Sequence, residues 1–213
     1  MNASSSIRQN STTTQLKILD AAESLFVERG FAATSLRAIA GLAEVNLAAT
    51  HYHFGSKEAL FQAAIHRRVN PINEARLQAL DELERSSRVL TVAAILAAFF
   101  KPLTEGGMSA PVTKLVGRIY GEPESITKPL LEGEFGVVAG RYSSALARAL
   151  PGLDETELRW RFHFMIGGMI QVLSFGGPLG MKESADTRQQ GIERLQSFAV
   201  AGFEQGQREV AGG

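Results

Sequence analysis

The sequence contains no cysteine and carries no net charge. With no cysteine among 213 residues, disulfide bonds and cysteine-ligated zinc are excluded. Lys and Arg number 22, and Asp and Glu also number 22, so the overall charge does not indicate a strongly anionic partner. The polar start of the chain, MNASSSIRQNST, has no apolar run long enough for a signal peptide. We therefore expect a cytoplasmic protein.

Long uncharged segments are also scarce. Residues 162–181 form a run of 20 residues without formal charge, which approaches the length of a membrane-spanning helix. Polar side chains interrupt this run at three positions, and Gly-Gly-Pro at residues 176–178 ends any helix early. We expect a helix that is buried on most sides and no membrane span.

Apolar residues that recur at spacings of three and four dominate what is present. Strand-like alternation and internal repeats are not evident, so the sequence predicts an all-α chain. Only the first 11 residues are expected to be disordered, and Pro71 predicts a helix end and a domain boundary near residue 70. The expected helices cover about residues 14–29, 36–43, 47–53, 57–69, 71–86, 89–103, 112–120, 126–150, 154–175 and 186–209.

Residues 34–61 carry the most specific pattern. They predict two short helices around a tight turn, followed by a third helix that Ser56 caps. Thr34 precedes the first short helix as a candidate cap, and Asn46 precedes the second. The second helix has only about two turns, which are stable only when packed against a partner. Such a pair can present a short helix to the DNA major groove, and this indicates a helix-turn-helix.

This region resembles the TetR family of bacterial transcription regulators. The matching residues are TTQLKILDAAESLFVERGFAATSLRAIA and HYHFGSKEALF, and the pattern covers about residues 13–64. VNLAATHYHFGSKEAL, RIYGEP and LARALPGLDETELRWRFHFMIGGMI resemble, more loosely, its fatty-acid-responsive, PsrA-like branch. The resemblance implies a helix-turn-helix head at residues 12–69 and a helical ligand-binding and dimerisation domain at residues 70–213. It also implies a homodimeric repressor that an apolar, acyl-type ligand releases from a palindromic operator.

Three positions depart from the family pattern. Glu44 stands where the family usually has glycine, so a left-handed backbone there would be strained by about 1 kcal/mol or more. Thr50 stands where the family has Leu or Val, and His51 stands where Tyr or Asn is common. These changes affect the turn and the operator sequence that the protein would read.

The predicted DNA contacts lie on the second short helix and at two helix starts. The small or apolar side chains of Leu47, Ala48 and Ala49 let the helix approach the groove and touch thymine methyl groups. The alternative is that Ala48 and Ala49 serve only to form the helix. The resemblance implies base or phosphate contacts for the aromatic and basic positions, and hydroxyls at a helix start suit phosphate. Tyr52 has the alternative of a partly buried core position, and Phe54 is expected inside the head. The predicted contacts are Thr34, Ser35, Asn46, Leu47, Ala48, Ala49, His51, Tyr52, His53 and Lys57.

The sequence gives no basis for catalysis, a cofactor or a metal. His51 and His53 are two residues apart on a helix, so they point to different faces and are poor metal ligands. No Ser/His/Asp set, carboxylate pair or phosphate loop is recognisable, so we predict a protein that is not an enzyme.

Aromatic and methionine residues in the C-terminal part predict a pocket for an apolar ligand. Arg141 and Arg161 are candidates to meet an acidic head group, although solvated helix faces explain them about as well. His163 has two interpretations, a hydrogen-bonded core histidine or a ligand contact. The predicted ligand residues are Phe99, Phe135, Arg141, Tyr142, Arg161, Phe162, His163 and Met165.

The last two helices are expected to form a four-helix dimer seam. Gly167-Gly168 would permit a close helix approach, and the apolar residues that need a partner are Ile192, Leu195, Phe198, Val200 and Phe203. Two alternatives remain: a small-molecule-binding or enzymatic helical protein with a degenerate head, and a constitutive DNA-binding protein without a ligand.

Overall fold

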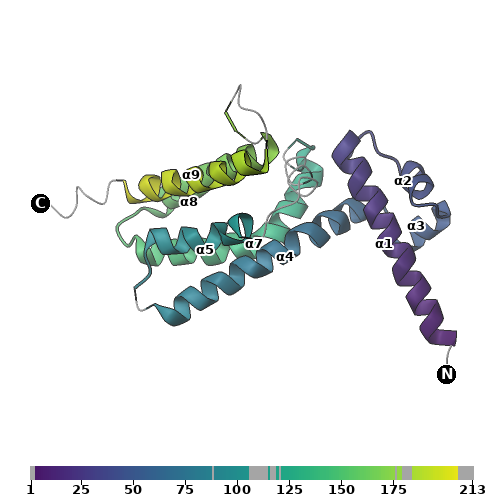
Figure 1. Ribbon diagram of the computed structural model, residues 1–213, viewed down its shortest axis with the longest axis horizontal. Coiled ribbons are helices and arrows are strands. Elements are labelled where there is room, and N and C mark those ends of the chain that lie inside the picture. The colour runs from purple at the N-terminus through teal and green to yellow at the C-terminus, as the bar shows by residue number, and fades with distance from the viewer. Residues whose placement is uncertain are drawn as a thin grey trace, which may run out of the picture. The chain divides into compact units, whose positions relative to one another are not determined.

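The computed structural model describes residues 3–87, 89–105, 115, 119, 121–175, 177–178 and 184–205. Every regular element within these residues is an α-helix, which confirms the predicted all-α class (Figure 1). The predicted helix at residues 112–120 falls outside the described residues except at positions 115 and 119. The helices are α1 (Ala3–Arg29), α2 (Leu36–Leu42), α3 (Leu47–Phe54), α4 (Lys57–Ser86), α5 (Val92–Thr104), α7 (Glu124–Ala149), α8 (Glu155–Phe175) and α9 (Ala185–Glu204).

The chain divides into two compact units. Unit 1 comprises Met1–Val69 and Ala110–Leu130, and unit 2 comprises Asn70–Ser109 and Leu131–Gly213. Sequence analysis assigned all of residues 70–213 to one domain, whereas the structure groups residues 110–130 with unit 1. Helices α4 and α7 each contribute to both units.

In unit 1, α1, α2 and α3 pack on one another around an aromatic centre (Figure 1). The rings of Phe26 and Phe61 meet edge to face at 4.9 Å between centroids, and Phe31 lies 5.3 Å from Phe61. The stripe predicted for the first helix, Ile18, Ala22, Leu25 and Phe26, is buried as expected. Burial of this stripe stabilises the unit by roughly 1.5–3 kcal/mol for each large side chain.

Helix α1 begins at Ala3, well before the predicted start at Thr14. Residues 3–11 were expected to be a disordered tail, and the structure shows them as helix. The prediction followed the apolar stripe, which begins near Leu16, but a helix that is already nucleated extends through polar residues without an apolar face.

Helix α4 continues through Pro71, where the sequence predicted a helix end. Proline removes one backbone hydrogen bond and crowds the preceding turn, but contacts on both sides of it hold the helix. Before Pro71, Arg67 and Arg68 pair with Glu23 of α1. After it, Arg76 donates a hydrogen bond from Nε to the Phe99 carbonyl oxygen at 3.1 Å.

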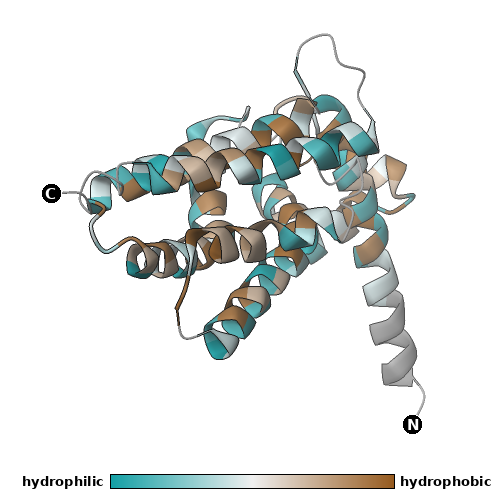
Figure 2. Ribbon diagram, turned by 60° about the vertical axis from the view of Figure 1, so that its left-hand side comes forward, coloured by the Kyte–Doolittle hydropathy of each residue, from teal (hydrophilic) through white to brown (hydrophobic). Residues whose placement is uncertain are grey.

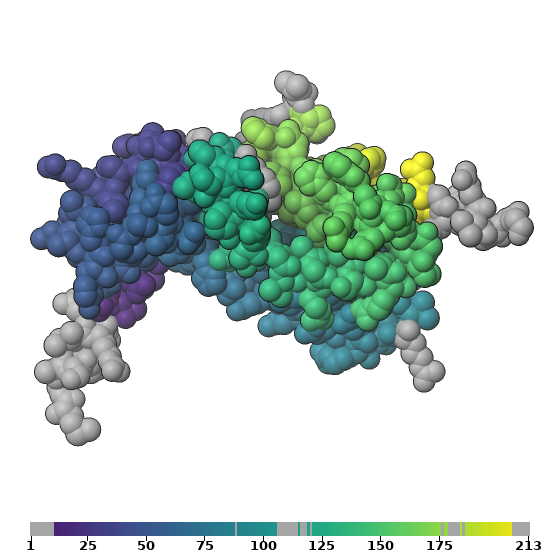
Figure 3. Space-filling model, turned by 180° about the vertical axis from the view of Figure 1, so that it is seen from behind, coloured from purple at the N-terminus to yellow at the C-terminus, as the bar shows by residue number. Residues whose placement is uncertain are grey.

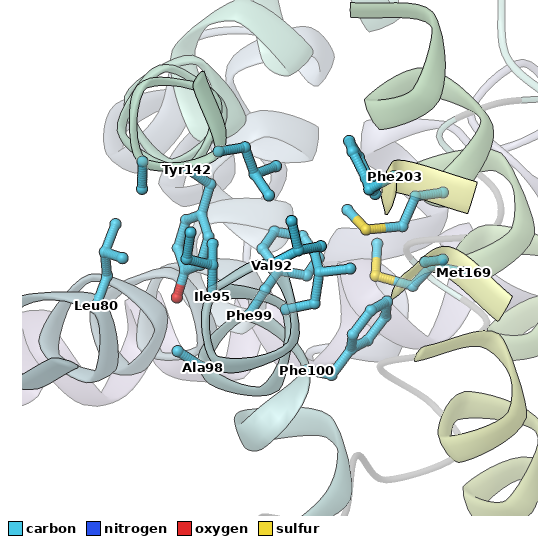
Figure 4. Packing of buried hydrophobic residues seen from close by; sticks show 14 of the residues in the cluster. Leu80, Val92, Ile95, Ala98, Phe99, Phe100, Tyr142, Met169 and Phe203 are labelled. Atoms are coloured by element: carbon cyan, nitrogen blue, oxygen red, sulfur yellow. The ribbon is translucent and has the colours of Figure 1, made fainter. Parts of the chain in front are cut away.

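The core of unit 2 is apolar and rich in aromatic rings. Helix α5 packs on α9, and α8 packs on α9, around Phe99, Phe100 and Phe203 (Figure 4). Apolar and polar residues alternate around these helices, as expected for helices that bury one face (Figure 2). At Gly168 of α8 an added β-carbon would lie 2.8 Å from Leu195 Cδ1, so glycine permits the close packing of α8 on α9.

Helix α8 has the predicted start. Asp154 Oδ1 accepts hydrogen bonds from the N–H groups of Thr156 and Glu157 at 2.8 and 3.2 Å, which confirms the predicted cap. The bond from the Glu157 N–H, followed by that from Thr156, lowers the pKa of Asp154. Among the described residues no helix is long and apolar enough to cross a membrane.

Candidate functional site

Helices α2 and α3 each begin at a capping residue, and one strained residue lies in the turn between them. Ser35 Oγ accepts a hydrogen bond from the Ala38 N–H at 3.1 Å and caps α2. Asn46 Oδ1 accepts one from the Ala48 N–H at 2.9 Å and caps α3 as predicted. Between them, Glu44 adopts φ 54°, the left-handed conformation that its position in the pattern suggested.

Thr34 has a different place from the one predicted. It is only 2% exposed, and its hydroxyl donates to the carbonyl oxygens of Gly30 at 2.7 Å and Leu25 at 3.3 Å. Thr34 therefore neither caps α2 nor offers its hydroxyl to a phosphate. Two adjacent hydroxyl residues gave the same sequence signal, and the structure assigns the cap to Ser35.

Helix α3 has one exposed edge and one buried edge. Tyr52 is 84% exposed, which excludes the alternative of a core position, and Leu47 and Ala48 are exposed on the preceding turn. Ala49, His53 and Phe54 are half-buried, so Phe54 is less enclosed than expected. Thr50 points inward at 0% exposure, and its hydroxyl has no hydrogen-bond partner among the described residues.

His51 is exposed and held by its own backbone. Its Nδ1 lies 3.0 Å from the Gly55 carbonyl oxygen. Because a carbonyl only accepts, Nδ1 carries a proton in this contact, and Nε2 is left for an outside partner. Gly55 has φ 72°, a conformation that allows α3 to end at Phe54.

Lys57, at the start of α4, ties α4 to the turn before α2. Its Nζ donates hydrogen bonds to the carbonyl oxygens of Phe31 at 2.9 Å and Thr34 at 3.0 Å, and it lies 4.1 Å from the centroid of the Phe31 ring. An ammonium group has three donors, so one remains for a phosphate. Lys57 is thus part of the architecture of the head as well as a candidate contact.

Sequence reasoning missed the ion-pair cluster that joins α1 to α4. Glu23 is buried, and Arg68 approaches it at 2.5 Å while Arg67 lies 3.5 Å from it and 2.8 Å from Asp20. The hydrogen bond to Glu23 raises the pKa of Arg68. The spacing of residues within each helix predicts only that these charges are exposed. The pairing joins residues far apart in sequence, so no local pattern indicates it.

Four of the predicted ligand residues, Phe99, Tyr142, Phe162 and Met165, meet in the core of unit 2. The Phe99 ring lies 5.0 Å from the Tyr142 ring (Figure 4). It lies 6.0 Å from the Phe162 ring. Met165 is buried in the same cluster, whereas Phe135 is half-buried and lies outside it. The Tyr142 hydroxyl donates to the Arg76 carbonyl oxygen at 2.8 Å, and burial raises its pKa.

The two predicted head-group arginines have other partners. Arg141 forms ion pairs with Asp81 at 2.6 Å and Glu84 at 3.0 Å, and the hydrogen bond to Asp81 raises its pKa. Arg161 donates from one guanidinium nitrogen to three carbonyl oxygens at the C-terminal end of α9. These groups hold helices together, because each guanidinium is occupied by oxygens of the chain itself.

His163 is exposed, so the interpretation of it as a core histidine is wrong, and its role as a ligand contact stays a prediction. Its ring contacts Trp160 at 5.9 Å and Phe164 at 6.3 Å on the outer side of α8. The charged residue that does enter the core is Arg76, which is 3% exposed and has its guanidinium 4.0 Å from the Phe99 ring centroid. A lone arginine in a helical segment gave no sequence signal for this.

Helices α8 and α9 expose large aromatic side chains. Trp160, Phe164 and Phe175 of α8 and Phe198 of α9 are each more than half exposed. Ile192 and Phe203, which were expected to need a partner subunit, are buried in the core of their own unit, and Leu195 and Val200 pack against that core. Of the predicted set only Phe198 faces outward.

Comparison with known proteins identifies both parts of the chain. Residues 18–64 match the model of bacterial regulatory proteins of the tetR family, and residues 93–202 match the tetracyclin repressor-like C-terminal domain. No curated protein matches the sequence significantly.

Solved structures share the fold at low sequence identity. A complex of SmeT with triclosan has a TM-score of 0.66 at 23% identity and covers 88% of this chain and 90% of its own. A protein of Pseudomonas aeruginosa PAO1 assigned as a transcriptional regulator has a TM-score of 0.65 at 17% identity and covers 92% of both chains. A TetR-family regulator of Bordetella parapertussis 12822 has a TM-score of 0.59 at 17% identity and covers 92% and 96%.

The matched C-terminal region alone spans more than half of the sequence, and the matched N-terminal region contains the helix-turn-helix described above. The chain therefore belongs to the TetR family of transcriptional regulators.

Proposed function

We propose that the protein is a homodimeric, ligand-responsive repressor that binds a palindromic operator. In this proposal residues 12–69 form the DNA-binding domain, and residues 70–213, apart from the segment 110–130 that groups with unit 1, form the ligand-binding and dimerisation domain. The observation that carries the proposal is the exposed edge of α3, a short helix that Asn46 caps, with Tyr52 at 84% exposure. A short, capped helix with small and aromatic residues on its free edge suits the major groove.

The contacts within this proposal divide into two groups. Lys57, Tyr52, His53 and the hydroxyl of Ser35 serve phosphates, because charge and hydrogen-bond donors at a helix start attract them. The short side chains on the exposed edge and the free Nε2 of His51 serve bases. The proposed contacts are Ser35, Asn46, Leu47, Ala48, Ala49, His51, Tyr52, His53 and Lys57.

Dimerisation through α8 and α9 is supported by the exposed aromatic side chains of Trp160, Phe164 and Phe198. Exposed aromatic side chains such as the stacked pair Trp160 and Phe164 are typical of an interaction site. Gly167 is exposed with nothing within 4 Å of an added β-carbon, while Gly168 is used within the chain. The glycine pair can thus serve packing within the subunit with one member and packing between subunits with the other.

Selection of binding sites from random duplex DNA tests the DNA-binding proposal. Two heads related by a two-fold axis require an inverted repeat whose half-sites present successive major grooves. Affinity for the selected duplex should fall steeply with salt, because each phosphate contact releases counterions. Recovery of no inverted repeat would contradict the proposal.

The proposed effector is a small apolar molecule, with acyl chains as the favoured class. The aromatic and methionine cluster of unit 2 supports an apolar ligand, and the sequence resemblance to a fatty-acid-responsive branch favours acyl chains. SmeT, which has this fold, is solved in complex with triclosan. Arg141 and Arg161 are not part of this proposal, because both are occupied by groups of the chain.

A second candidate is a helical small-molecule-binding protein whose head no longer binds DNA. The strained Glu44 and the Thr50 hydroxyl, which has no hydrogen-bond partner among the described residues, favour this candidate, because both destabilise the helix-turn-helix. A gel shift against the upstream region of the gene for this protein separates the two candidates, and a DNA complex that no ligand releases would indicate a constitutive regulator instead.

A further inference from the structure

The turn between α1 and α2 determines where the helix-turn-helix begins. Gly30 has φ 78°, and its N–H closes α1 on the Phe26 carbonyl oxygen at 3.0 Å. The Phe31 ring then packs against the rings of Phe26 and Phe61. Because Phe31 is buried, its N–H needs a hydrogen-bond partner within the protein.

That partner is Glu122, a residue 91 positions further along the chain. Its Oε1 accepts a hydrogen bond from the Phe31 N–H at 2.8 Å. The same oxygen lies 2.9 Å from the place that a β-carbon at residue 30 would occupy. The carboxylate and Gly30 therefore fit each other, and a β-carbon at position 30 would force the Glu122 carboxylate to shift.

Glu122 comes from the segment 110–130, which belongs to unit 1. The green-teal atoms of this part of the chain lie against the purple and blue atoms of the N-terminal helices (Figure 3). Helix α7 begins two residues later at Glu124 and extends to Ala149 in unit 2. A side chain at the start of α7 thus holds the turn that leads into α2.

Lys57 and Glu122 bind the two backbone polar groups of Phe31, its carbonyl oxygen and its N–H. Lys57 donates to the Phe31 carbonyl oxygen at 2.9 Å, and Glu122 accepts from the Phe31 N–H at 2.8 Å. Charged partners make such hydrogen bonds roughly twice as strong as neutral ones. Three separate segments therefore meet at one residue, and Glu122 supplies the contact that is most distant in sequence.

We propose that Glu122 is a positioning residue for DNA binding: its carboxylate fixes the α1–α2 turn and thereby the placement of α2 and α3 on α1. The proposal rests on the DNA-binding function proposed above. Without the carboxylate, the Phe31 N–H is buried and unpaired, and the turn loses its contact with the start of α7. If α3 is less well placed, it forms weaker contacts in the major groove, so the affinity for DNA falls although no DNA contact has been removed.

The test compares Glu122→Ala, Glu122→Gln and the matched control Glu124→Ala in the full-length protein. Glu124 is exposed and lies on the same segment, so its replacement makes the same change of charge. The probe is the inverted-repeat duplex that the wild-type protein selects from random DNA. Amide hydrogen exchange at Phe31 is measured in parallel, without DNA.

Glu122→Ala should weaken duplex binding about tenfold and speed exchange of the Phe31 amide by a similar factor, as expected for loss of a buried hydrogen bond. Glu122→Gln keeps an acceptor oxygen and should restore most of both losses, and Glu124→Ala should change neither. Equal binding by the two alanine variants would overturn the proposal, as would a Gln variant no better than Ala. If the wild type selects no duplex, the DNA-binding proposal fails, whereas the exchange measurement still decides whether Glu122 holds the turn.

A double-mutant cycle with Gly30→Ala gives an independent check. Gly30→Ala should impair thermal stability less in the Glu122→Ala background than in the wild type, because the collision at 2.9 Å is then absent. Additive effects would contradict the fit between the two residues.

Discussion

At residue 44 a side chain occupies a backbone conformation that glycine adopts without cost. Glu44 has φ 54°, which strains an L-residue by about 1 kcal/mol. We expect Glu44→Gly to raise the free energy of unfolding by about 0.5–1 kcal/mol in urea, because relief of the strain exceeds the added freedom of the unfolded chain. Glu44→Ala removes the same charge but keeps the β-carbon, so its stability should stay close to that of the wild type. Equal stabilisation by both variants would assign the effect to charge.

Two buried threonines in unit 1 should respond to valine in opposite directions. The Thr50 hydroxyl has no partner among the described residues, so Thr50→Val should stabilise the protein by about 1 kcal/mol. The Thr34 hydroxyl donates to two carbonyl oxygens, so Thr34→Val should destabilise it by about 1–3 kcal/mol. Thermal unfolding of both variants checks this, and shifts of the same sign would contradict it.

His51 and Lys57 should differ in how they affect DNA recognition. With Nδ1 bonded to Gly55, Nε2 of His51 is available to a base, and in the neutral form of the ring it is an acceptor that suits the amino group of adenine or cytosine. His51→Ala should therefore relax base preference at one position of each half-site in a selection experiment. Lys57→Ala should weaken binding on all sequences alike and also lower the melting temperature, because it frees two turn carbonyls. A melting temperature equal to that of the wild type would show that the lysine serves DNA alone.

Local signals explain which of these residues could be predicted. The caps Asn46 and Asp154 and the left-handed Glu44 depend on neighbours within a few positions, and the sequence predicted them correctly. Thr34 and Ser35 are adjacent hydroxyl residues, and only the packing of Thr34 against α1 decides which of them caps α2. The partners of Arg141 and Arg161 and the exposure of His163 depend on how helices pack, so no local signal could give them.

At the scale of helices, the outer face of α8 and α9 should determine oligomeric state. Phe198 is 76% exposed, so Phe198→Ser should leave the helical content unchanged while it converts a dimer to a monomer at micromolar concentration. Phe203 lies on the same helix at 1% exposure, and Phe203→Ser should cost about 3–5 kcal/mol of stability. Sedimentation velocity and circular dichroism measure the two effects. A wild-type protein that sediments as a monomer would contradict the proposed seam.

Helix bounds were predictable where apolar periodicity changes, and they were not where packing overrides a local rule. The predicted helix at residues 47–53 corresponds to α3, which ends one residue later. Pro71 predicted an end to α4, yet ion pairs to Glu23 and the hydrogen bond of Arg76 hold the helix on both sides. Of the glycine pair in α8, Gly168 packs against Leu195 within the subunit, a choice that the pattern alone could not make.

Across the whole molecule, the sequence predicted the all-α class because helical periodicity is a local property. It did not predict that residues 110–130 belong with the N-terminal helices, because that grouping depends on contacts such as the one between Glu122 and Phe31. The same limit applies to Arg76, whose contact with Phe99 joins two helices.

Release of DNA by a ligand is the prediction that involves the whole molecule. An acyl chain that enters the apolar core of unit 2 gains about 0.8 kcal/mol for each methylene removed from water. A hundredfold shift of the dimer away from DNA needs about 2.7 kcal/mol of differential binding, which roughly three or four methylenes provide if they are buried in one state alone. We expect longer acyl chains to release the selected duplex more effectively until the site is full. In the absence of DNA the same chains should raise the melting temperature in the same order, because a ligand that binds the folded state stabilises it.

Arg141→Ala and Arg161→Ala should leave the preference for an acidic head group unchanged, because both side chains are held by the chain itself. A loss of that preference in either variant would restore the head-group assignment, and a duplex that no chain length releases would rule out acyl induction while DNA binding stands.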